Sequence, residues 1–132
     1  MKTFLDANVL IVAWRGDAAR KMRALTLLND PQRRFVCSPF IKLELLPKAI
    51  YYHNQQEQEF YNDYFQLVDE WVEDFESMYD DAARVGAKFG LAAMDALHIA
   101  AALLSQTDEF VTAERPTSPF SRVSGVKITT IY

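Results

Sequence analysis

The segment Thr-Phe-Leu-Asp-Ala-Asn-Val-Leu-Ile at residues 3–11 decides the fold that we expect for this chain. It reads as a short buried strand that stops at Asp6 and, after Asn8, runs into an apolar helical turn. A strand buried on both faces is apolar throughout, so packing does not explain a carboxylate at its carboxyl end. In parallel sheets, ligands bind beyond these strand ends. Asp6 is therefore the first candidate for a functional residue.

The rest of the chain alternates between strand-like and helix-like segments. Short apolar or alternating runs predict further strands, at residues 35–37, 110–113 and 127–132. Helical spacing and cap-like residues predict helices, at residues 9–14, 18–28, 40–46, 54–71, 77–90 and 90–104. This alternation predicts an α/β fold with a parallel sheet and right-handed crossovers. We expect the first and third predicted strands to end on one common edge.

Capping residues set the expected helix boundaries. Ser38 can accept hydrogen bonds from the free amides of a helix, and Pro39 suits the first helical position. Pro47 is expected to bend or end this helix. Residues Asn54 to Glu57 fit a capping box. The remaining signals are caps at Asp17 and at Ser77 with Asp80, and a stop at Gly90.

Three further carboxylates can lie near the same edge as Asp6. Glu114 follows the third predicted strand, Asp95 lies in the first turns of a helix that is apolar on all sides, and Glu44 lies in an apolar helical run. Each also has an ordinary structural explanation, because Glu44 suits a helix surface and the helix dipole can satisfy Asp95. His98, one turn after Asp95, is interpreted as a histidine packed in the core.

Four carboxylates at one edge would repel one another. A pair about 4 Å apart near a protein surface costs on the order of 4 kcal/mol, so such a cluster needs protons or cations. Oxygen ligands favour hard ions, which makes Mg²⁺ or Mn²⁺ the expected metal. Such an ion can activate water and neutralise the charge of an in-line displacement at phosphorus. The reaction that this arrangement favours is phosphodiester hydrolysis.

The composition fits one globular domain. The chain has 132 residues, of which 50% are hydrophobic, and a net charge of −4. Its one cysteine, Cys37, lies in an apolar run, which favours a buried thiol and excludes a disulfide within the chain. No apolar run approaches the roughly 18 to 20 residues of a membrane span, and the first residues lack the order of a signal peptide. We therefore expect a cytoplasmic protein.

Charge and aromatic residues are unevenly distributed. Residues 1–34 contain seven basic and three acidic side chains, whereas residues 54–84 contain ten acidic side chains and Arg84 as the one basic residue. Both segments are interpreted as solvated helix faces, with guidance of a polyanion by the basic segment as the alternative. Residues 60–71 contain more aromatic side chains than the core-facing side of a single helix requires. A homodimer or partner-protein interface is therefore a hypothesis.

Four groups of residues, taken in order, resemble the four successive motifs of PIN domains. They are Phe-Leu-Asp6-Ala-Asn8-Val-Leu-Ile, Ser38 with Glu44, Gly90-Leu91 leading to Asp95-Ala-Leu-His-Ile-Ala-Ala-Ala, and Val111-Thr112-Ala-Glu114-Arg. The resemblance spans the chain and implies a single PIN-like domain at residues 1–132. From the helix signals we expect the two helices at about residues 54–90 to form an arm of this domain or a surface for a partner. The resemblance also implies a three-layer α/β/α sandwich and Mg²⁺- or Mn²⁺-dependent cleavage of RNA. It further suggests a VapC-type ribonuclease toxin with an antitoxin protein as partner, often a homodimer.

The resemblance also assigns roles to individual residues. Asp6, Glu44 and Asp95 match the three principal acids that hold metal, and Glu114 occupies a position where the family usually has aspartate. Ala7 replaces a common threonine or serine, which removes a hydroxyl that could orient Asp6. The positions that fit supporting roles are Asn8, Ser38 and Thr112.

Two other functions remain open at this point. The chain could be a catalytically weak PIN-like module that binds RNA or protein, with a metal site weakened by Ala7 and Glu114. It could also be a phosphatase or phosphotransferase that uses Asp6 as nucleophile. Such an enzyme would favour a second aspartate at the position of Asn8.

Overall fold

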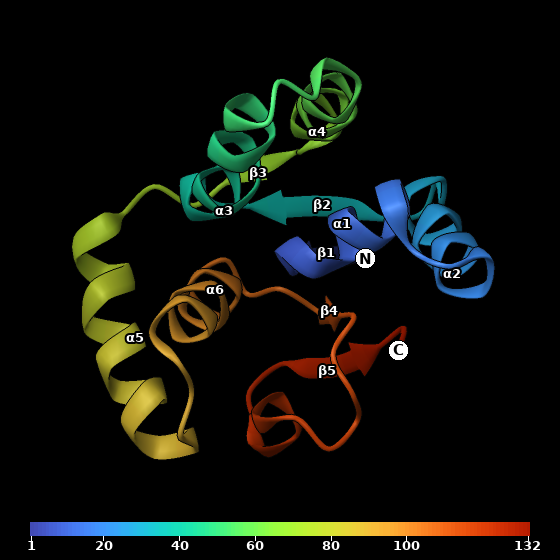
Figure 1. Cartoon of the computed structure of the whole chain (residues 1–132). Helices are drawn as coiled ribbons and strands as arrows, with labels where there is room; N and C mark the ends of the chain where they lie inside the picture. Colours follow the sequence, from blue (N-terminus) through green and yellow to red (C-terminus); the bar gives the residue numbers. More distant parts are fainter.

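A wholly parallel, five-stranded sheet forms the centre of the computed structural model, which describes residues 1–132. The strand order is β3-β2-β1-β4-β5 (Figure 1). The strands are β1 (Lys2–Leu5), β2 (Arg34–Cys37), β3 (Glu70–Trp71), β4 (Glu109–Thr112) and β5 (Lys127–Thr130). Because β1, β2 and β3 follow one another in one direction and β4 and β5 lie on the other side of β1, the order reverses between β1 and β4. Ligands of open α/β sheets bind at this kind of reversal.

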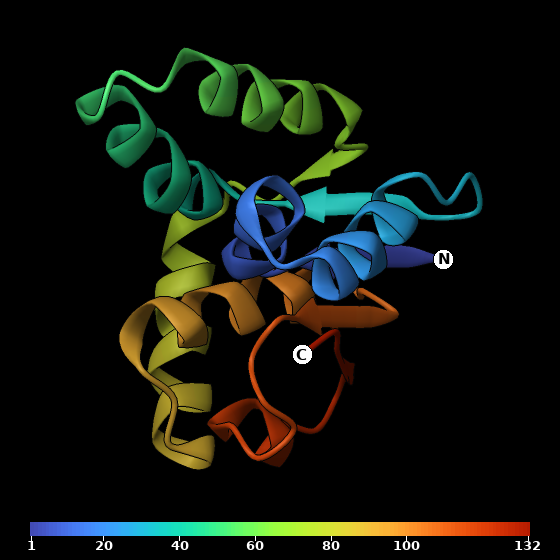
Figure 2. The ribbon, with the colours of Figure 1, turned by 45° about the vertical axis from the view of Figure 1, so that its right-hand side comes forward.

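Helices cover both faces of the sheet and complete a three-layer α/β/α sandwich, as the family resemblance implied (Figures 1 and 2). The pairs α1 with α2 and α3 with α4 pack together on one face, and the pair α5 with α6 packs on the other. The helices are α1 (Ala7–Arg15), α2 (Ala18–Leu28), α3 (Pro39–Tyr51), α4 (Gln55–Leu67), α5 (Phe75–Phe89) and α6 (Ala93–Leu104), and a 3₁₀ turn, η1 (Pro119–Arg122), precedes β5.

Aromatic packing fixes the two central strands against each other. Phe4 of β1 and Phe110 of β4 are fully buried, and their ring centroids are 5.5 Å apart. Phe120 of η1 packs on Phe110 at 5.1 Å. Each such pair stabilises the fold by about 0.5–1.5 kcal/mol beyond burial. The resulting register pairs Leu5 with Val111, so the residues that follow β1 and β4 start next to each other at one edge of the sheet.

The structure corrects two predicted helix boundaries. Of the two outcomes expected at Pro47, a bend or an end, the end does not occur, since α3 continues to Tyr51 with buried residues on both sides of the proline and only one backbone donor lost. The cap of α5 is Asp74 rather than Ser77, since Asp74 Oδ1 accepts the Ser77 amide hydrogen at 3.1 Å. The predicted stop at Gly90 is confirmed, and its φ of +70° explains the glycine.

The strand β3 was not predicted, because two residues carry no periodicity. The helix expected to continue to Trp71 ends at Leu67, and the chain then pairs with β2 through Asp69 and Val72, whose amides donate to Phe35 and Cys37. Glu70 and Trp71, within the acidic segment, thereby form an edge strand of the sheet.

The acidic face of α4 is not wholly solvated, contrary to the prediction. Glu57 is 4% exposed and accepts hydrogen bonds from Arg15 of α1 and from Tyr61. Asn54 caps the helix, and its side-chain amide donates to Glu57 at 3.1 Å. Glu57 therefore ties α4 to α1.

Most of the aromatic residues of the same segment belong to the core. Tyr61, Tyr64 and Phe65 are buried, and Tyr64 packs edge-on against Phe35 at 5.6 Å.

Cys37 is also buried, as expected, and burial raises the pKa of its thiol to about 12. No helix has by itself the length and apolar composition of a membrane span, although the pair α5 and α6, bent by 114°, has them when taken together.

Candidate metal centre

Asp6 occupies the point where β1 passes into α1. It is the N-cap of α1, and its Oδ1 accepts the amide hydrogen of Ala7 at 2.8 Å. Its Oδ2 accepts the hydroxyl hydrogen of Thr112 at 3.0 Å, and its amide donates to the carbonyl of Val111 at 2.9 Å. Both carboxylate oxygens are therefore fixed in direction at the end of the sheet, and the side chain is only 4% exposed.

Asn8 holds the end of β4 against α1. Its Oδ1 accepts the amide hydrogen of Ala113 at 2.9 Å, and its Nδ2 lies 3.3 Å from the Thr112 hydroxyl. Because Thr112 also contacts Asp6, the three side chains form one network at the point where the strand order reverses. Asn8 and Thr112, to which the resemblance assigned supporting roles, both belong to this network.

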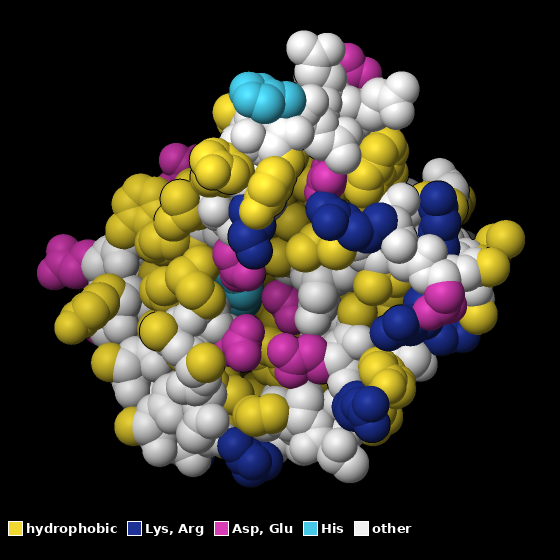
Figure 3. Space-filling model, in the orientation of Figure 1, with side chains coloured by type: hydrophobic (Ala, Val, Ile, Leu, Met, Phe, Trp, Pro, Cys, Tyr) yellow, Lys and Arg dark blue, Asp and Glu magenta, His cyan; other side chains and the backbone are white.

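Three of the four predicted acids lie together. One carboxylate oxygen each from Asp6, Asp95 and Glu114 lies within 4.8 Å of the other two. Asp95 comes from the first turn of α6, and Glu114 follows β4 by two residues. Figure 3 shows acidic side chains gathered in a hollow at the middle of the face, with Lys and Arg side chains to its right. We call Asp6, Asp95 and Glu114 the acid cluster.

Glu44 lies at the border of this cluster. Its Oε1 faces Nε2 of His98, a histidine of α6 that is fully buried. Nε2 of His98 donates a hydrogen bond to Glu44, and Nδ1 has no hydrogen-bond partner. Sequence reasoning left His98 out, although its position three residues after Asp95 puts both on one face of a helix.

Ser38 does not join the acid cluster. It is buried, and its Oγ accepts the amide hydrogen of Phe40 at 3.2 Å, which caps α3. Its contribution is to set the start of the helix that carries Glu44.

Burial and mutual repulsion disfavour negative charge at the cluster. The pKa of Asp6 is raised to about 6, mainly by burial and also by repulsion from Asp95 and Glu44, against the opposing effects of His98 and Thr112. Burial also raises the pKa of Asp95, with repulsion from Glu114 as the next cause. A cation placed among these oxygens would relieve the repulsion.

The donor set and its spacing fit a hard divalent ion. Carboxylate oxygens are the ligands that Mg²⁺ takes at about 2.0–2.1 Å and Ca²⁺ at 2.3–2.6 Å, so two ligands of one ion lie up to about 4–5 Å apart. The 4.8 Å spread of the acid cluster agrees with that span. Neither cysteine nor a free imidazole nitrogen joins the cluster, which disfavours a zinc site.

Comparison with known proteins agrees with this architecture. A family model described as the PIN domain matches residues 3–125. No curated protein sequence matches the chain significantly. Among solved structures, the fold is similar to a chain of a toxin–antitoxin complex from Klebsiella pneumoniae, with 21% identity, a TM-score of 0.72 and 98% of each chain covered.

Two further structures show the same fold. A chain of VapBC2 from Rickettsia felis bound to a DNA fragment from its promoter gives a TM-score of 0.74 at 16% identity, with 98% of each chain covered. A chain of DNA-bound VapBC from Salmonella typhimurium gives a TM-score of 0.74 at 15% identity, with 100% of this chain and 99% of that chain covered. The similarity thus extends over the whole chain at low sequence identity.

Proposed function

This chain belongs to the PIN domain family, and from that premise we propose that it is a divalent-metal-dependent endoribonuclease that hydrolyses RNA phosphodiester bonds. The observation that carries the proposal is the acid cluster, in which oxygens of Asp6, Asp95 and Glu114 lie within 4.8 Å of one another. Asp6 is buried and the other two acids are partly buried, and such a mutually repelling group of carboxylates is costly unless it binds a cation. We propose Mg²⁺ or Mn²⁺ as that cation.

In this proposal, Asp6, Asp95 and Glu114 hold the ion. When bound, the ion supplies charge neutralisation at the scissile phosphate and activation of the attacking water. Thr112 and the amide of Ala7 orient the two oxygens of Asp6, so the Asp6 side chain loses little conformational freedom when the ion binds. Glu44, oriented by His98, offers a further carboxylate at the border for a proton or a second ion.

Substitution of Asp6 tests the nuclease. RNA cleavage by the purified protein is followed with Mn²⁺, with Mg²⁺ and with EDTA, and Asp6→Asn is compared with Asp63→Asn, a control on the exposed face of α4. We expect cleavage by wild type and by Asp63→Asn with either ion, and none with EDTA or for Asp6→Asn. Full cleavage by Asp6→Asn, or by wild type in EDTA, would contradict the proposal.

The cellular role that we propose is that of a toxin paired with an antitoxin protein. Each of the three similar structures described above comes from a toxin–antitoxin or VapBC complex, which supports this role. Induced expression of wild type is expected to arrest bacterial growth, whereas Asp6→Asn is not. Equal growth of cells that express either protein would contradict the toxin role.

We also propose that the protein forms a homodimer. Several large apolar side chains of α3 and α5 remain exposed, among them Leu43, Ile50, Tyr51 and Tyr79. Burial of such a surface stabilises by about 25 cal/mol per Å². A monomer at every concentration in analytical ultracentrifugation would contradict the homodimer.

One observation favours the alternative, a catalytically weak module that binds RNA or protein. Both oxygens of Asp6 already accept hydrogen bonds, and the raised pKa of this side chain opposes the charged form that a metal needs. Calorimetry with Mn²⁺ separates the two functions. Specific binding by wild type that is lost in Asp6→Asn supports the nuclease, and the absence of specific binding supports the module.

A further inference from the structure

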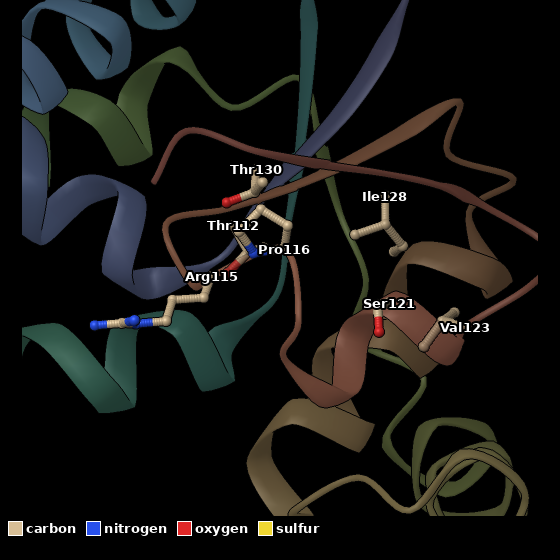
Figure 4. Close-up of a pocket in the computed structure, with 7 residues that line it drawn as sticks. All are labelled: Thr112, Arg115, Pro116, Ser121, Val123, Ile128 and Thr130. Atoms are coloured by element: carbon tan, nitrogen blue, oxygen red, sulfur yellow. The ribbon is translucent and has the colours of Figure 1, made fainter.

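A second hollow, separate from the acid cluster but adjacent to it, lies between β5 and η1. Its volume is about 370 Å³, and Figure 4 shows Ile128 and Thr130 of β5 facing Ser121 and the neighbouring Val123 across it. We call it the β5 hollow. Its volume can hold one nucleoside, and no acidic side chain lines it.

Two threonines join the β5 hollow to the acid cluster. Thr112 lines the hollow and donates its hydroxyl hydrogen to Oδ2 of Asp6 at 3.0 Å. Thr130 lines it as well, and its hydroxyl donates to the backbone carbonyl of Glu114. A molecule in the hollow would therefore lie beside the acids that we propose to hold the ion.

The lining combines apolar surface with hydroxyl groups. Val123 and Ile128 are partly exposed and offer apolar surface to a flat ring. The hydroxyl of Ser121 is exposed and makes no hydrogen bond within the protein, so it remains free for a polar edge of a ligand. Apolar surface with a few well-placed polar groups is the pattern of a small-molecule site and suits the flat, polar-edged ring of a nucleobase.

A free guanidinium lies at one end of the hollow. Arg115 is exposed and forms no ion pair, and Figure 4 shows its side chain extending away from Ser121 and Val123. Its Cζ lies 5.0 Å from the ring centroid of Tyr132, and Cζ of Arg20 lies 5.4 Å from the same centroid. Arg20 is already paired with Asp17, at 2.6 Å, which leaves Arg115 as the cation available to a phosphate.

We propose that the β5 hollow binds the nucleoside next to the scissile phosphate of single-stranded RNA, and that Arg115, at the end of the hollow where Thr112 and Thr130 join the acid cluster, contacts a phosphate of the same strand. The inference rests on the proposed nuclease function and names a part of its substrate site. A single strand is required because a paired and stacked base cannot enter the hollow.

Binding of RNA by an inactive protein tests the proposal without dependence on cleavage. Fluorescence anisotropy of a labelled single-stranded RNA is measured with Asp6→Asn alone and with a second substitution, Ser121→Trp to fill the hollow or Arg115→Gln to remove the charge. Matched controls in the same background are Ser124→Trp, an exposed serine outside the hollow, and Arg84→Gln, an exposed arginine of α5. Thermal unfolding verifies that each variant is folded.

We expect Ser121→Trp and Arg115→Gln each to weaken RNA binding by about tenfold, and the two controls to match Asp6→Asn. Arg115→Gln should also lower the slope of log K against log salt by about 0.7, the value for one phosphate contact of a single strand. Equal affinity of all five proteins, or equal binding of a duplex RNA, would overturn the β5 hollow as a nucleoside site.

The proposed nuclease function is tested by a separate measurement, the Mn²⁺-dependent cleavage of RNA by wild type. Cleavage by wild type together with equal affinities of all five proteins rejects the β5 hollow alone. Absent cleavage together with the tenfold losses rejects the nuclease and supports the hollow as an RNA-binding site.

Discussion

Nε2 of His98 faces Oε1 of Glu44, so a fully buried imidazole of α6 orients an acid of α3 that lies 54 positions earlier in the chain. The contact joins helices on opposite faces of the sheet beside Asp6. His98 also favours the charged forms of Asp6 and Asp95, whose pKa values it lowers against the larger effect of burial. The acid cluster and its border therefore act as one electrostatic unit.

Replacement of His98 should lower activity through Glu44. His98→Phe fills the site but has no donor, whereas His98→Gln keeps a donor near the position of Nε2. We expect the single-turnover cleavage rate at saturating Mn²⁺ to fall by about tenfold in His98→Phe and to be largely retained in His98→Gln. Equal rates for the two folded variants would show that the contact with Glu44 has no role in cleavage.

Glu114 and Glu44 should contribute unequally to metal affinity. Glu114 belongs to the acid cluster, whereas Glu44 is engaged by His98 at its border. We expect Glu114→Gln to weaken Mn²⁺ binding, measured by calorimetry at pH 7, by at least about tenfold, and Glu44→Gln to have a smaller effect. The reverse order would mean that Glu44 is the principal ligand and that the cluster rearranges around the ion.

The metal-free protein should lose stability as pH rises from about 4 to about 6. The pKa of Asp6 rises from 3.8 to about 6 on folding, so the folded state binds more protons than the unfolded state within this window. At 1.36 kcal/mol per pH unit, the full effect is at most about 3 kcal/mol. Below pH 4 Asp6 is protonated in both the folded and the unfolded state, so its ionisation no longer lowers the free energy of unfolding.

Asp6→Asn isolates this contribution. In urea unfolding with EDTA, the variant should be more stable than wild type at pH 7 by up to about 3 kcal/mol, and the two curves should converge near pH 4. Asp63→Asn, whose side chain is exposed, serves as the control and should match wild type at both values. A difference that is the same at pH 4 and pH 7 would contradict the assignment to ionisation of Asp6.

Glu57 should stabilise the fold through its contacts with α1. Glu57→Ala removes the acceptor of Arg15 and of Tyr61, whose buried hydroxyl would lose its partner. Because Arg15 is largely exposed and can be solvated by water, we expect a loss of about 2 kcal/mol in urea unfolding, less than for a pair with both partners buried. Glu59→Ala, at an exposed position of the same helix, should change the free energy of unfolding by less than about 0.5 kcal/mol.

Local signals in the sequence predicted several helix boundaries whose cause is local, although the cap of α5 was assigned to Ser77 instead of Asp74. Asp17 caps α2 as predicted, because its carboxylate accepts the amide hydrogen of Arg20 three residues later. Gly90 ends α5, because a left-handed φ favours glycine. The alternation of strands and helices also predicted the parallel sheet, since short buried strands must be joined by crossovers.

Signals that depend on distant partners were missed or misread. The carboxylate of Glu57 resembles its solvated neighbours in the sequence, and only contact with Arg15 of α1 accounts for its burial. His98 resembles an ordinary core residue, and only the placement of α3 against α6 gives it Glu44 as a partner. The edge strand at Glu70 and Trp71 exists because β2 offers it free backbone groups.

The sequence by itself determined the α/β class and the residues from which an acidic site could be built, because strand ends, caps and apolar periodicity are properties of neighbouring residues. Only the tertiary structure decided which acids meet. The pairing of β1 with β4 brings Asp6 and Glu114 together, α6 adds Asp95, and His98 holds Glu44 at the border. The physical reason is that repulsion between carboxylates falls with distance, so the chemistry of the site depends on a spacing that the order of residues does not contain.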